Sequence, residues 1–244
     1  MSRRLSLLCA AGAAALAVTL GAAQFSAAQT SPETSARVAR TIAELEAAIA
    51  ETEREIERVQ AHDEIDNLIR AYGYYLDQNM WDDLADLFAE DGTIELAQRG
   101  VYVGRERIRE FLHVQFGAPG PAPGRLGDHL QIQPVIIVAD DGETAIARTR
   151  VLQMMSFPGG GASWLGGVYL NDFVKEDGVW KFKTDHVFNT FIARYDGGWA
   201  HAANPGLPGQ STRLPPDRPP SVEFQSFPDV IDIPWTYDNP VTGE

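Results

Sequence analysis

The stretch AYGYYLDQNMWDDLADLFAEDGTIEL, residues 71–96, constrains the fold most, because it runs a tyrosine-rich helix through an acidic turn into a second helix and a strand. Tyr72, Tyr75 and Leu76 continue the i, i+3, i+4 spacing of the apolar residues before them, so their side chains should point toward a core. Asp77 ends the apolar run. The pattern predicts a carboxylate beside phenols at a core edge; alternatively, Asp77 is a solvated helix end or a cap.

Composition excludes several classes of protein. The chain has 244 residues, enough for one sizeable domain with appendages. Its single cysteine, Cys9, lies in the leader described below, so we expect neither a disulfide nor a four-thiolate zinc site in the mature chain. The formal net charge of −14 repels nucleic acid and anionic lipid, so no nucleic-acid partner is expected.

Residues 1–28 have the pattern of a secretory signal peptide. A short basic region precedes an apolar run, and the small residues at 26–28 predict cleavage after Ala28. We therefore expect a periplasmic or secreted protein, with no stable membrane insertion after cleavage. The alternative is an uncleaved leader that anchors the protein in a membrane, because the apolar run over residues 5–23 is nearly long enough to span a bilayer.

Residues 29–60 combine a polar linker with a long amphipathic helix. Apolar residues recur there in a heptad frame between many charged residues, namely at Val38, Ile42, Leu45, Ile49, Ile56 and Val59. Such a helix packs on its own domain or on a neighbouring subunit. We favour the subunit contact, and hence a homo-oligomer that is a dimer or a trimer.

Residues 61–196 have the element order of an α+β domain. We expect helices over 61–78, 81–90 and 105–116, with a strand over 92–97 and a short hairpin partner through Tyr102. A Pro/Gly-rich loop follows, and then strands over 129–140, 143–157, 164–177 and 179–193. Helices first and a strand meander afterwards predict helices on one face of an antiparallel sheet.

The last segment, residues 197–244, is rich in proline and has no sustained periodicity. It nevertheless carries large apolar residues, among them Trp199, Phe224, Ile231 and Trp235. These are too many for a free tail, so we expect an extended arm that packs over the domain or over its partner.

Strand periodicity identifies two candidate histidines. His129, Gln131 and Gln133 share one face of their strand, which fits either a polar cavity wall or a solvent-exposed face. On the last strand, His186 shares its predicted face with Trp180, Phe182, Thr184 and Phe188. A histidine in that apolar setting is either a satisfied core residue or a tuned acid or base.

Three further residues are candidates for binding a substrate. Asn171 and Tyr169 lie on the preceding strand, and Asn171 would point an amide into the same cavity. Trp164 would form a hydrophobic rim, although an exposed hairpin tryptophan is equally common. Together with Tyr72, these residues are the predicted substrate-binding set.

Acid/base chemistry without a cofactor is the economical interpretation. Asp77, His129 and His186 could together bind iron or zinc, but nothing in their spacing requires a metal, and we predict none. The sequence contains no glycine-rich phosphate loop before a helix and no nucleophile elbow. A carboxylate paired with a histidine in an apolar cavity can shuttle a proton near neutral pH, and phenols can hold a substrate oxygen.

The chain resembles the SnoaL-like branch of the nuclear transport factor 2 superfamily, which includes scytalone dehydratase. The resemblance covers about Ala61 to Arg194. It rests on Tyr72 through Asp77, Trp81, Asp82, Phe88, Asp91, Gly92, Gly104, Ile108, His129, Pro134, Gly142, Ala145, Tyr169, Asn171, Gly178 and Trp180. The resemblance implies a cone in which a curved sheet wraps around helices, with a pocket at its open end and usually an oligomeric assembly.

The same resemblance implies catalytic roles. In scytalone dehydratase a tyrosine–aspartate pair ends the first helix, and the aspartate pairs with a strand histidine. Asp77 occupies the aspartate's place here, but Leu76 replaces the adjacent tyrosine, so Tyr72 or Tyr75 would substitute from the previous turn. His129 falls near the strand histidine common in this branch, whereas a role for His186 follows from strand phase alone.

The leader, the long helix and the ending IPWTYDNPVTGE also resemble sphingomonad diarylpropane or phenylcoumaran γ-formaldehyde lyases. Those lyases release formaldehyde from lignin-derived diaryl compounds without a cofactor. The resemblance implies a lyase that uses Asp77, His129, His186 and Tyr75 on a small aromatic substrate. A dehydratase or isomerase of a small cyclic or aromatic substrate, and a noncatalytic ligand-binding protein, are the alternatives.

Overall fold

The computed structural model describes residues 31–199, 209–223, 227–229 and 232–244. The chain divides into two units, residues 1–48 and 49–244, and the second unit contains the whole sheet. The predicted leader, Phe224 and Ile231 lie outside the described residues. No helix within the described part of the chain has the length and apolarity needed to cross a membrane.

The helix α1 runs from Pro32 to Asp77 without interruption. The predicted separation into two helices near residue 60 was wrong, because neither glycine nor proline occurs between Pro32 and Gly73 to end the helix. The heptad residues are at least half exposed in the single chain, so the subunit contact stays a prediction. From Ala61 onward one face of α1 is buried against the core.

Two short helices and two short strands follow α1. The helix α2 (Trp81–Asp86) is shorter than predicted, because Phe88 already begins the strand β1 (Phe88–Leu96) and is fully buried. A short 3-10 turn, η1 (Ala97–Arg99), leads to β2 (Val101–Val103), and α3 (Arg105–Phe116) follows, as predicted.

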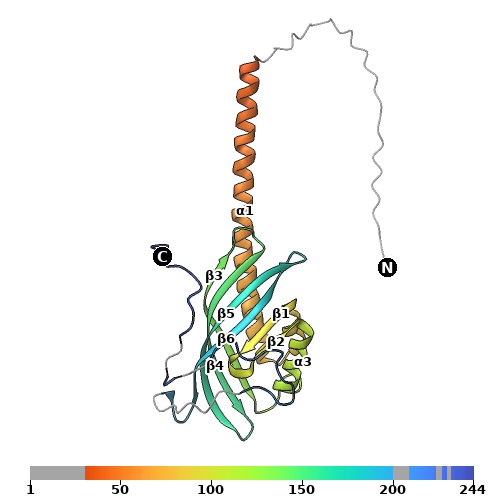
Figure 1. Ribbon diagram of the computed structural model, residues 1–244, viewed down its shortest axis with the longest axis vertical. Helices are drawn as coiled ribbons and strands as arrows, with labels where there is room; N and C mark the ends of the chain where they lie inside the picture. The colour runs from red at the N-terminus through yellow and green to blue at the C-terminus, as the bar shows by residue number, and fades with distance from the viewer. Residues whose placement is uncertain (1–30, 200–208, 224–226, 230–231) are drawn as a thin grey trace, which may run out of the picture. The chain divides into compact units, whose positions relative to one another are not determined.

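Four long strands complete the sheet: β3 (Leu126–Val138), β4 (Thr144–Phe157), β5 (Gly161–Glu176) and β6 (Val179–Arg194). The six strands lie in the order β2-β1-β6-β5-β4-β3, and Figure 1 shows the long strands curving together with α3 beside β1 and β2. All neighbouring pairs are antiparallel except β1 and β6, which are parallel. The predicted α+β class is therefore confirmed.

A β-bulge in β6 changes which side chains face the core. Phe173 pairs with Phe182, but the preceding Asp172 pairs with Thr184, so Lys183 is an extra residue. One extra residue reverses the inward and outward alternation beyond it. Asp185 therefore lies on the same face of β6 as Phe182, and His186 lies on the opposite face.

Residues 214–221 of the C-terminal segment contact β1 and β2, whereas Pro234 and Trp235 contact Arg148 on β4. The Tyr102 hydroxyl donates a hydrogen bond to the backbone oxygen of Leu214 (2.9 Å), and Val101 forms a β-bridge with Arg218. The Ser221 amide donates to Glu95 Oε1 (2.7 Å). These contacts attach the segment to the edge strand β2 and to Glu95 on β1, and they bring Leu214 into the core.

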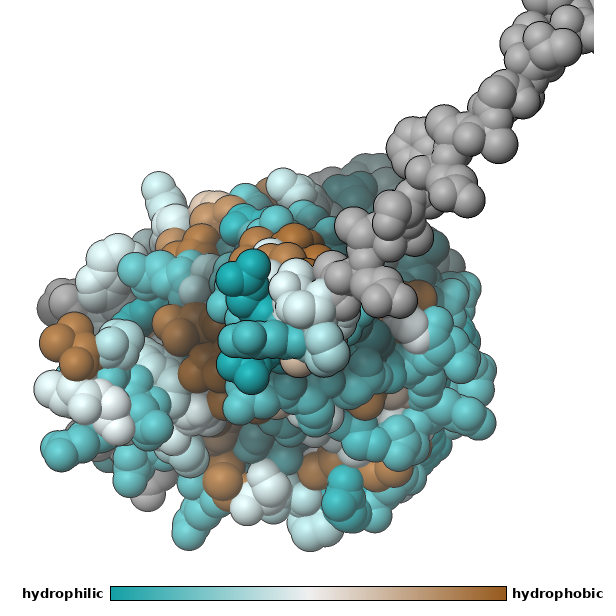
Figure 2. Space-filling view, turned by 90° about the horizontal axis from the view of Figure 1, so that it is seen from above, coloured by the Kyte–Doolittle hydropathy of each residue, from teal (hydrophilic) through white to brown (hydrophobic). Residues whose placement is uncertain are grey.

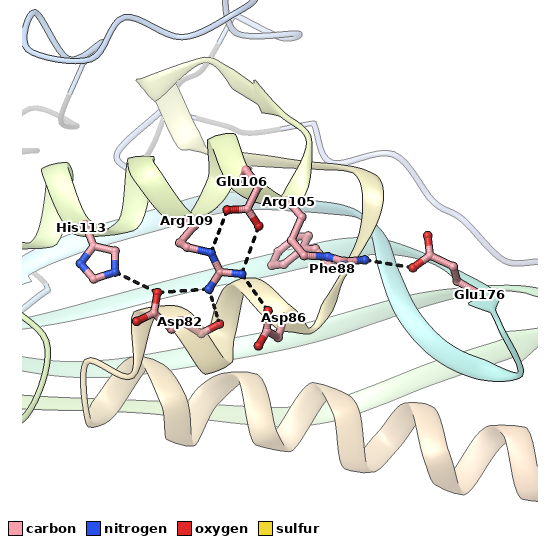
Figure 3. Close-up of polar contacts among 8 residues, drawn as sticks. All are labelled: Asp82, Asp86, Phe88, Arg105, Glu106, Arg109, His113 and Glu176. Carbon is pink, nitrogen blue, oxygen red and sulfur yellow. Dashed lines mark hydrogen bonds and ion pairs between the residues drawn. The ribbon is translucent and has the colours of Figure 1, made fainter.

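Ion pairs join α2 to α3. Arg109 on α3 donates to Asp82 Oδ1 (3.1 Å), to Asp86 Oδ1 (2.7 Å) and to Glu106 Oε2 (3.2 Å) (Figure 3). The His113 ring lies 3.2 Å from the same Asp82 oxygen. The face drawn in Figure 2 is mostly hydrophilic, with separate apolar patches.

Candidate active site

A cavity of about 440 Å³ opens beside the C-terminal end of α1. Its wall is largely apolar and aromatic, and includes Trp81, Phe116, Phe157, Leu165 and Val187. Its polar lining side chains include Arg99, Arg125, His129, Gln153, Tyr169 and Asn189. A mostly apolar cavity with a few polar groups is the usual form of a small-molecule site.

Asp77 and His129 form a hydrogen-bonded pair at this cavity. Asp77 Oδ1 accepts one hydrogen bond from the His129 backbone amide and one from His129 Nδ1, both at 2.8 Å. Their side chains are only 14% and 15% exposed. Because a carboxylate can only accept, Nδ1 carries the ring proton, and Nε2 of the neutral ring keeps a lone pair for a ligand.

Close packing of α1 against β3 makes this pair possible. Gly73 lies one helical turn before Asp77, and a Cβ at this position would come within 2.8 Å of the His129 backbone oxygen. The missing side chain lets the helix approach the strand at the height of the histidine. Gly73 is thus part of the geometry that brings Asp77 to His129.

A buried polar cluster lies behind the cavity wall. Asp185 is fully buried, and burial raises the pKa of its carboxyl group to about 7, against a smaller lowering by the Tyr72 hydroxyl. The Asn171 amide, oriented to satisfy its neighbours, donates to Asp185 Oδ1 at 2.9 Å. Burial also raises the pKa values of Tyr72 and Tyr169, so both phenols are neutral donors at physiological pH.

The predicted residues are only partly brought together. His129, Tyr72 and Tyr169 line the cavity, and the two tyrosine rings meet edge to face at 5.9 Å. Tyr75 is partly buried against the core and does not line the cavity, and Asn171 faces Asp185 instead. Trp164 lies outside the cavity as well, with its ring 6.4 Å from that of Tyr195.

The expectation that His186 shares the face of Trp180 and Phe182 was wrong. The bulge at Lys183 turns His186 to the other face of the sheet, where its Nε2 lies 3.6 Å from Glu95 Oε1. Burial lowers the pKa of His186, while Glu95 opposes this effect. His186 therefore does not converge with Asp77 and His129.

The three-residue metal site considered from the sequence is not assembled. Asp77 and His129 are adjacent, but His186 lies across the sheet from them. Among the described residues, no group of three or more potential metal-binding side chains comes together.

Sequence reasoning missed several polar residues in and behind the cavity wall, Arg125 and Gln153 among them. Asp185 was assigned to the outer face, because the bulge before it leaves no mark in the periodicity of a single strand. Asn189, which lines the cavity, was missed for the same reason. Arg99 stands in the short turn η1, where its only signal was a basic residue in an otherwise apolar hairpin segment.

The sequence was compared with known proteins. It matches the SnoaL-like domain family over residues 57–186, which is more than half of the chain. No curated protein matches it significantly.

Solved structures share the fold. A hexachlorocyclohexane dehydrochlorinase, LinA type 2, is 20% identical, covers 63% of this chain and 99% of its own, and has a TM-score of 0.52. LinA type 3 from Novosphingobium barchaimii LL02 is 18% identical over 62% of this chain and 99% of its own, with a TM-score of 0.51.

A putative scytalone dehydratase from Novosphingobium aromaticivorans DSM 12444 is 25% identical, with a TM-score of 0.49 over 64% of this chain and 99% of its own.

The family match covers the part of the chain that forms the candidate site. The matched residues 57–186 include Asp77 at the end of α1, the strand residue His129 and most of the curved sheet. The chain belongs to the SnoaL-like domain family, within the NTF2-like superfamily.

Proposed function

We propose that this protein is a cofactor-independent lyase that acts on a phenolic or diaryl, lignin-derived substrate by acid/base chemistry. One observation supports the proposal above all: the hydrogen bond from His129 Nδ1 to Asp77 Oδ1 beside an aromatic-lined cavity. The pair holds a neutral imidazole in one tautomer, with its second nitrogen available to a substrate. Such a histidine can take up and return a proton near neutral pH.

The proposed reaction converts a diarylpropane diol into a stilbene, formaldehyde and water. His129 Nε2 takes the proton of the terminal hydroxyl group, whose oxygen becomes the carbonyl oxygen of formaldehyde. The electrons of the broken C–C bond form the stilbene double bond as the benzylic oxygen leaves. His129 returns its proton to that oxygen, so the departing group is water and the enzyme ends in its starting state.

Asp77 acts through His129 in this scheme. Among the described residues, Asp77 Oδ1 accepts hydrogen bonds from His129 alone, and the carboxylate is not part of the cavity wall. Its negative charge stabilises the imidazolium that forms when His129 takes the proton. Asp77 is therefore a positioning residue, whereas the sequence had favoured it as the base.

The cavity suits an aromatic substrate. Its volume of about 440 Å³ lies in the range of sites for drug-sized ligands. Trp81, Phe116 and Tyr169 offer ring surfaces for the aromatic groups. The neutral phenol of Tyr169 can donate a hydrogen bond to a substrate oxygen, whereas the Tyr72 hydroxyl is directed to Asp185.

A dehydratase is the second candidate, because the same pair can remove a carbon-bound proton. In that reaction His129 would take a proton from the carbon next to a leaving oxygen, and no formaldehyde would form. A hexachlorocyclohexane dehydrochlorinase, LinA type 2, shares this fold.

The test is to incubate chelator-treated protein with a panel of phenolic diarylpropane diols and to follow formaldehyde and stilbene absorbance together. We expect both products in equal amounts, and their loss in a His129→Gln variant. His62→Gln is the matched control, because His62 is exposed on α1 and away from the cavity. Loss of water without formaldehyde would indicate the dehydratase, and tight binding without any product would indicate a binding protein.

A further inference from the structure

Two arginines line the cavity without a carboxylate partner. Arg99 reaches it from η1 and Arg125 from the loop just before β3. Neither forms an ion pair with any carboxylate of the described residues, although the chain has 34 acidic residues. By contrast Arg105, Arg107 and Arg109, which lie outside the cavity on α3, each pair with at least one acidic side chain.

Arg99 is a half-buried guanidinium whose Nε is fully buried. Its Nη1 donates one long hydrogen bond, 3.5 Å, to the Leu96 backbone oxygen, and Nε has no hydrogen-bond partner among the described residues. Burial lowers the pKa of Arg99, because desolvation disfavours the charged form. A buried charge without a partner is costly, so an anion that enters the cavity would relieve that cost.

Arg125 is arranged in a similar way. Its Nη1 donates a 3.4 Å hydrogen bond to the Phe116 backbone oxygen, and its Cζ lies 5.6 Å from the centre of the Phe157 ring. The Arg99 Cζ lies 5.7 Å from the centre of the Phe116 ring. The rings lie beside both guanidinium groups, and most of the N–H donors of the two arginines have no hydrogen-bond partner in the described part of the chain.

We infer that Arg99 and Arg125 form an anion subsite in this cavity, and that the natural substrate is an aromatic compound bearing a carboxylate group. A carboxylate is the anion whose planar oxygens best match the guanidinium fork, and the aromatic wall accommodates the ring that carries it. This inference rests on the proposed function for the reaction, but the subsite itself concerns binding alone.

The first test compares two ligands on the wild-type protein. The probes are para-hydroxycinnamate and para-hydroxycinnamamide, which share ring, phenol and size but differ in charge. Binding is measured by titration calorimetry and by quenching of tryptophan fluorescence, to which Trp81 in the cavity wall contributes. We expect the carboxylate to bind at least about tenfold more tightly than the amide at low salt, whereas equal affinities would overturn the inference.

The second test assigns the preference to Arg99. Arg99→Gln should weaken binding of the carboxylate about tenfold or more and change binding of the amide less than about twofold. Arg99→Lys, which keeps the charge but loses the fork, should fall between the two. The matched control is Arg150→Gln, because Arg150 is exposed on β4 and does not line the cavity. An unchanged carboxylate affinity in a folded Arg99→Gln protein would also overturn the inference.

Activity and binding can fail separately in these experiments. If the protein prefers the carboxylate but turns over no diaryl diol, the anion subsite is supported and the lyase proposal is wrong. If the protein releases formaldehyde from neutral diols but shows no charge preference, the lyase proposal is supported and the anion subsite is wrong. Asp77→Asn should retain the wild-type preference, because its carboxylate is bonded to His129 and is not part of the cavity wall.

Discussion

A single oxygen atom of Asp77 holds His129 at two points. Asp77 Oδ1 accepts the backbone amide and the ring Nδ1 of His129, each at 2.8 Å. The backbone bond ties the end of α1 to β3, and the ring bond fixes the orientation and tautomer of the imidazole. We therefore expect both folding and the proposed catalysis to depend on the same carboxylate.

We predict that Asp77→Asn lowers kcat by about 10² to 10⁴ while the protein remains folded. The amide keeps an oxygen that can accept the His129 backbone N–H, but it removes the charge that stabilises the imidazolium. Steady-state kinetics on the diaryl diol and thermal unfolding of the same preparation measure the two effects.

Asp83→Asn is the control for this substitution, since Asp83 is an exposed acid on α2. It should retain wild-type activity. Full activity of Asp77→Asn would remove the Asp77–His129 pair from the mechanism.

We predict that Gly73→Ala lowers both stability and activity. The new Cβ would come within 2.8 Å of the His129 backbone oxygen and 3.2 Å of Gln131 Cγ, so α1 and β3 must move apart. Overpacking of this kind costs about 1 to 3 kcal/mol of the free energy of unfolding. The shift should lengthen the Asp77–His129 hydrogen bonds, so kcat should fall by more than the loss of folded protein explains.

Gly209→Ala is the matched control, because a Cβ at Gly209 would meet no atom within 4 Å. Denaturant unfolding and kinetics on both variants separate the two effects. A Gly73→Ala protein with wild-type stability and kcat would show that the close approach of α1 to β3 is not required.

We predict that stability depends on pH, because the pKa of the Asp185 carboxyl group is raised. Its pKa is raised to about 7, so between pH 4 and 7 the folded protein binds a proton that the unfolded chain releases. The free energy of unfolding should then fall as the pH rises through this window, by as much as about 4 kcal/mol for a shift of about three pH units.

Asp185→Asn removes this titration. The variant should gain stability relative to the wild type when the pH is raised from 5 to 8, because the wild type alone must then bury a charge. Denaturant unfolding at both pH values measures the difference. The same stability difference at pH 5 and pH 8 would show that Asp185 does not titrate in this range.

Part of the site could be predicted from the sequence, because local periodicity determines which residues of a helix or strand face inward. Tyr72 and Asp77 lie on one helix whose inward face follows from spacing within the chain. His129 lies near the beginning of β3, before the irregularity between Ile132 and Val135, so its strand phase held. Bringing Asp77 and His129 together required tertiary structure, and for this the resemblance to the family supplied the expectation.

The other residues of the site could not be placed from periodicity, because their positions depend on pairing between strands or on tertiary structure. The bulge at Lys183 exists only relative to β5, so counting residues along β6 alone placed His186 inside and Asp185 outside. Arg99 gave no periodic signal, because η1 is only three residues long. The role proposed for Arg99 rests on the lack of an ion pair with any described carboxylate, which is a property of the folded chain.

We predict that Arg109→Gln lowers stability by about 1 kcal/mol, without a direct effect on the site. Arg109 joins α2 to α3 through Asp82 and Asp86 (Figure 3), but these acids are about two-thirds exposed, so solvent weakens each pair. The loss should shrink in 1 M salt, because screening removes most of the attraction in the wild type. Arg150→Gln is the control for charge alone, because Arg150 is exposed and forms no ion pair with another described residue. A loss that is the same at low and high salt would assign the contribution of Arg109 to packing of its side chain between the helices and not to its charge.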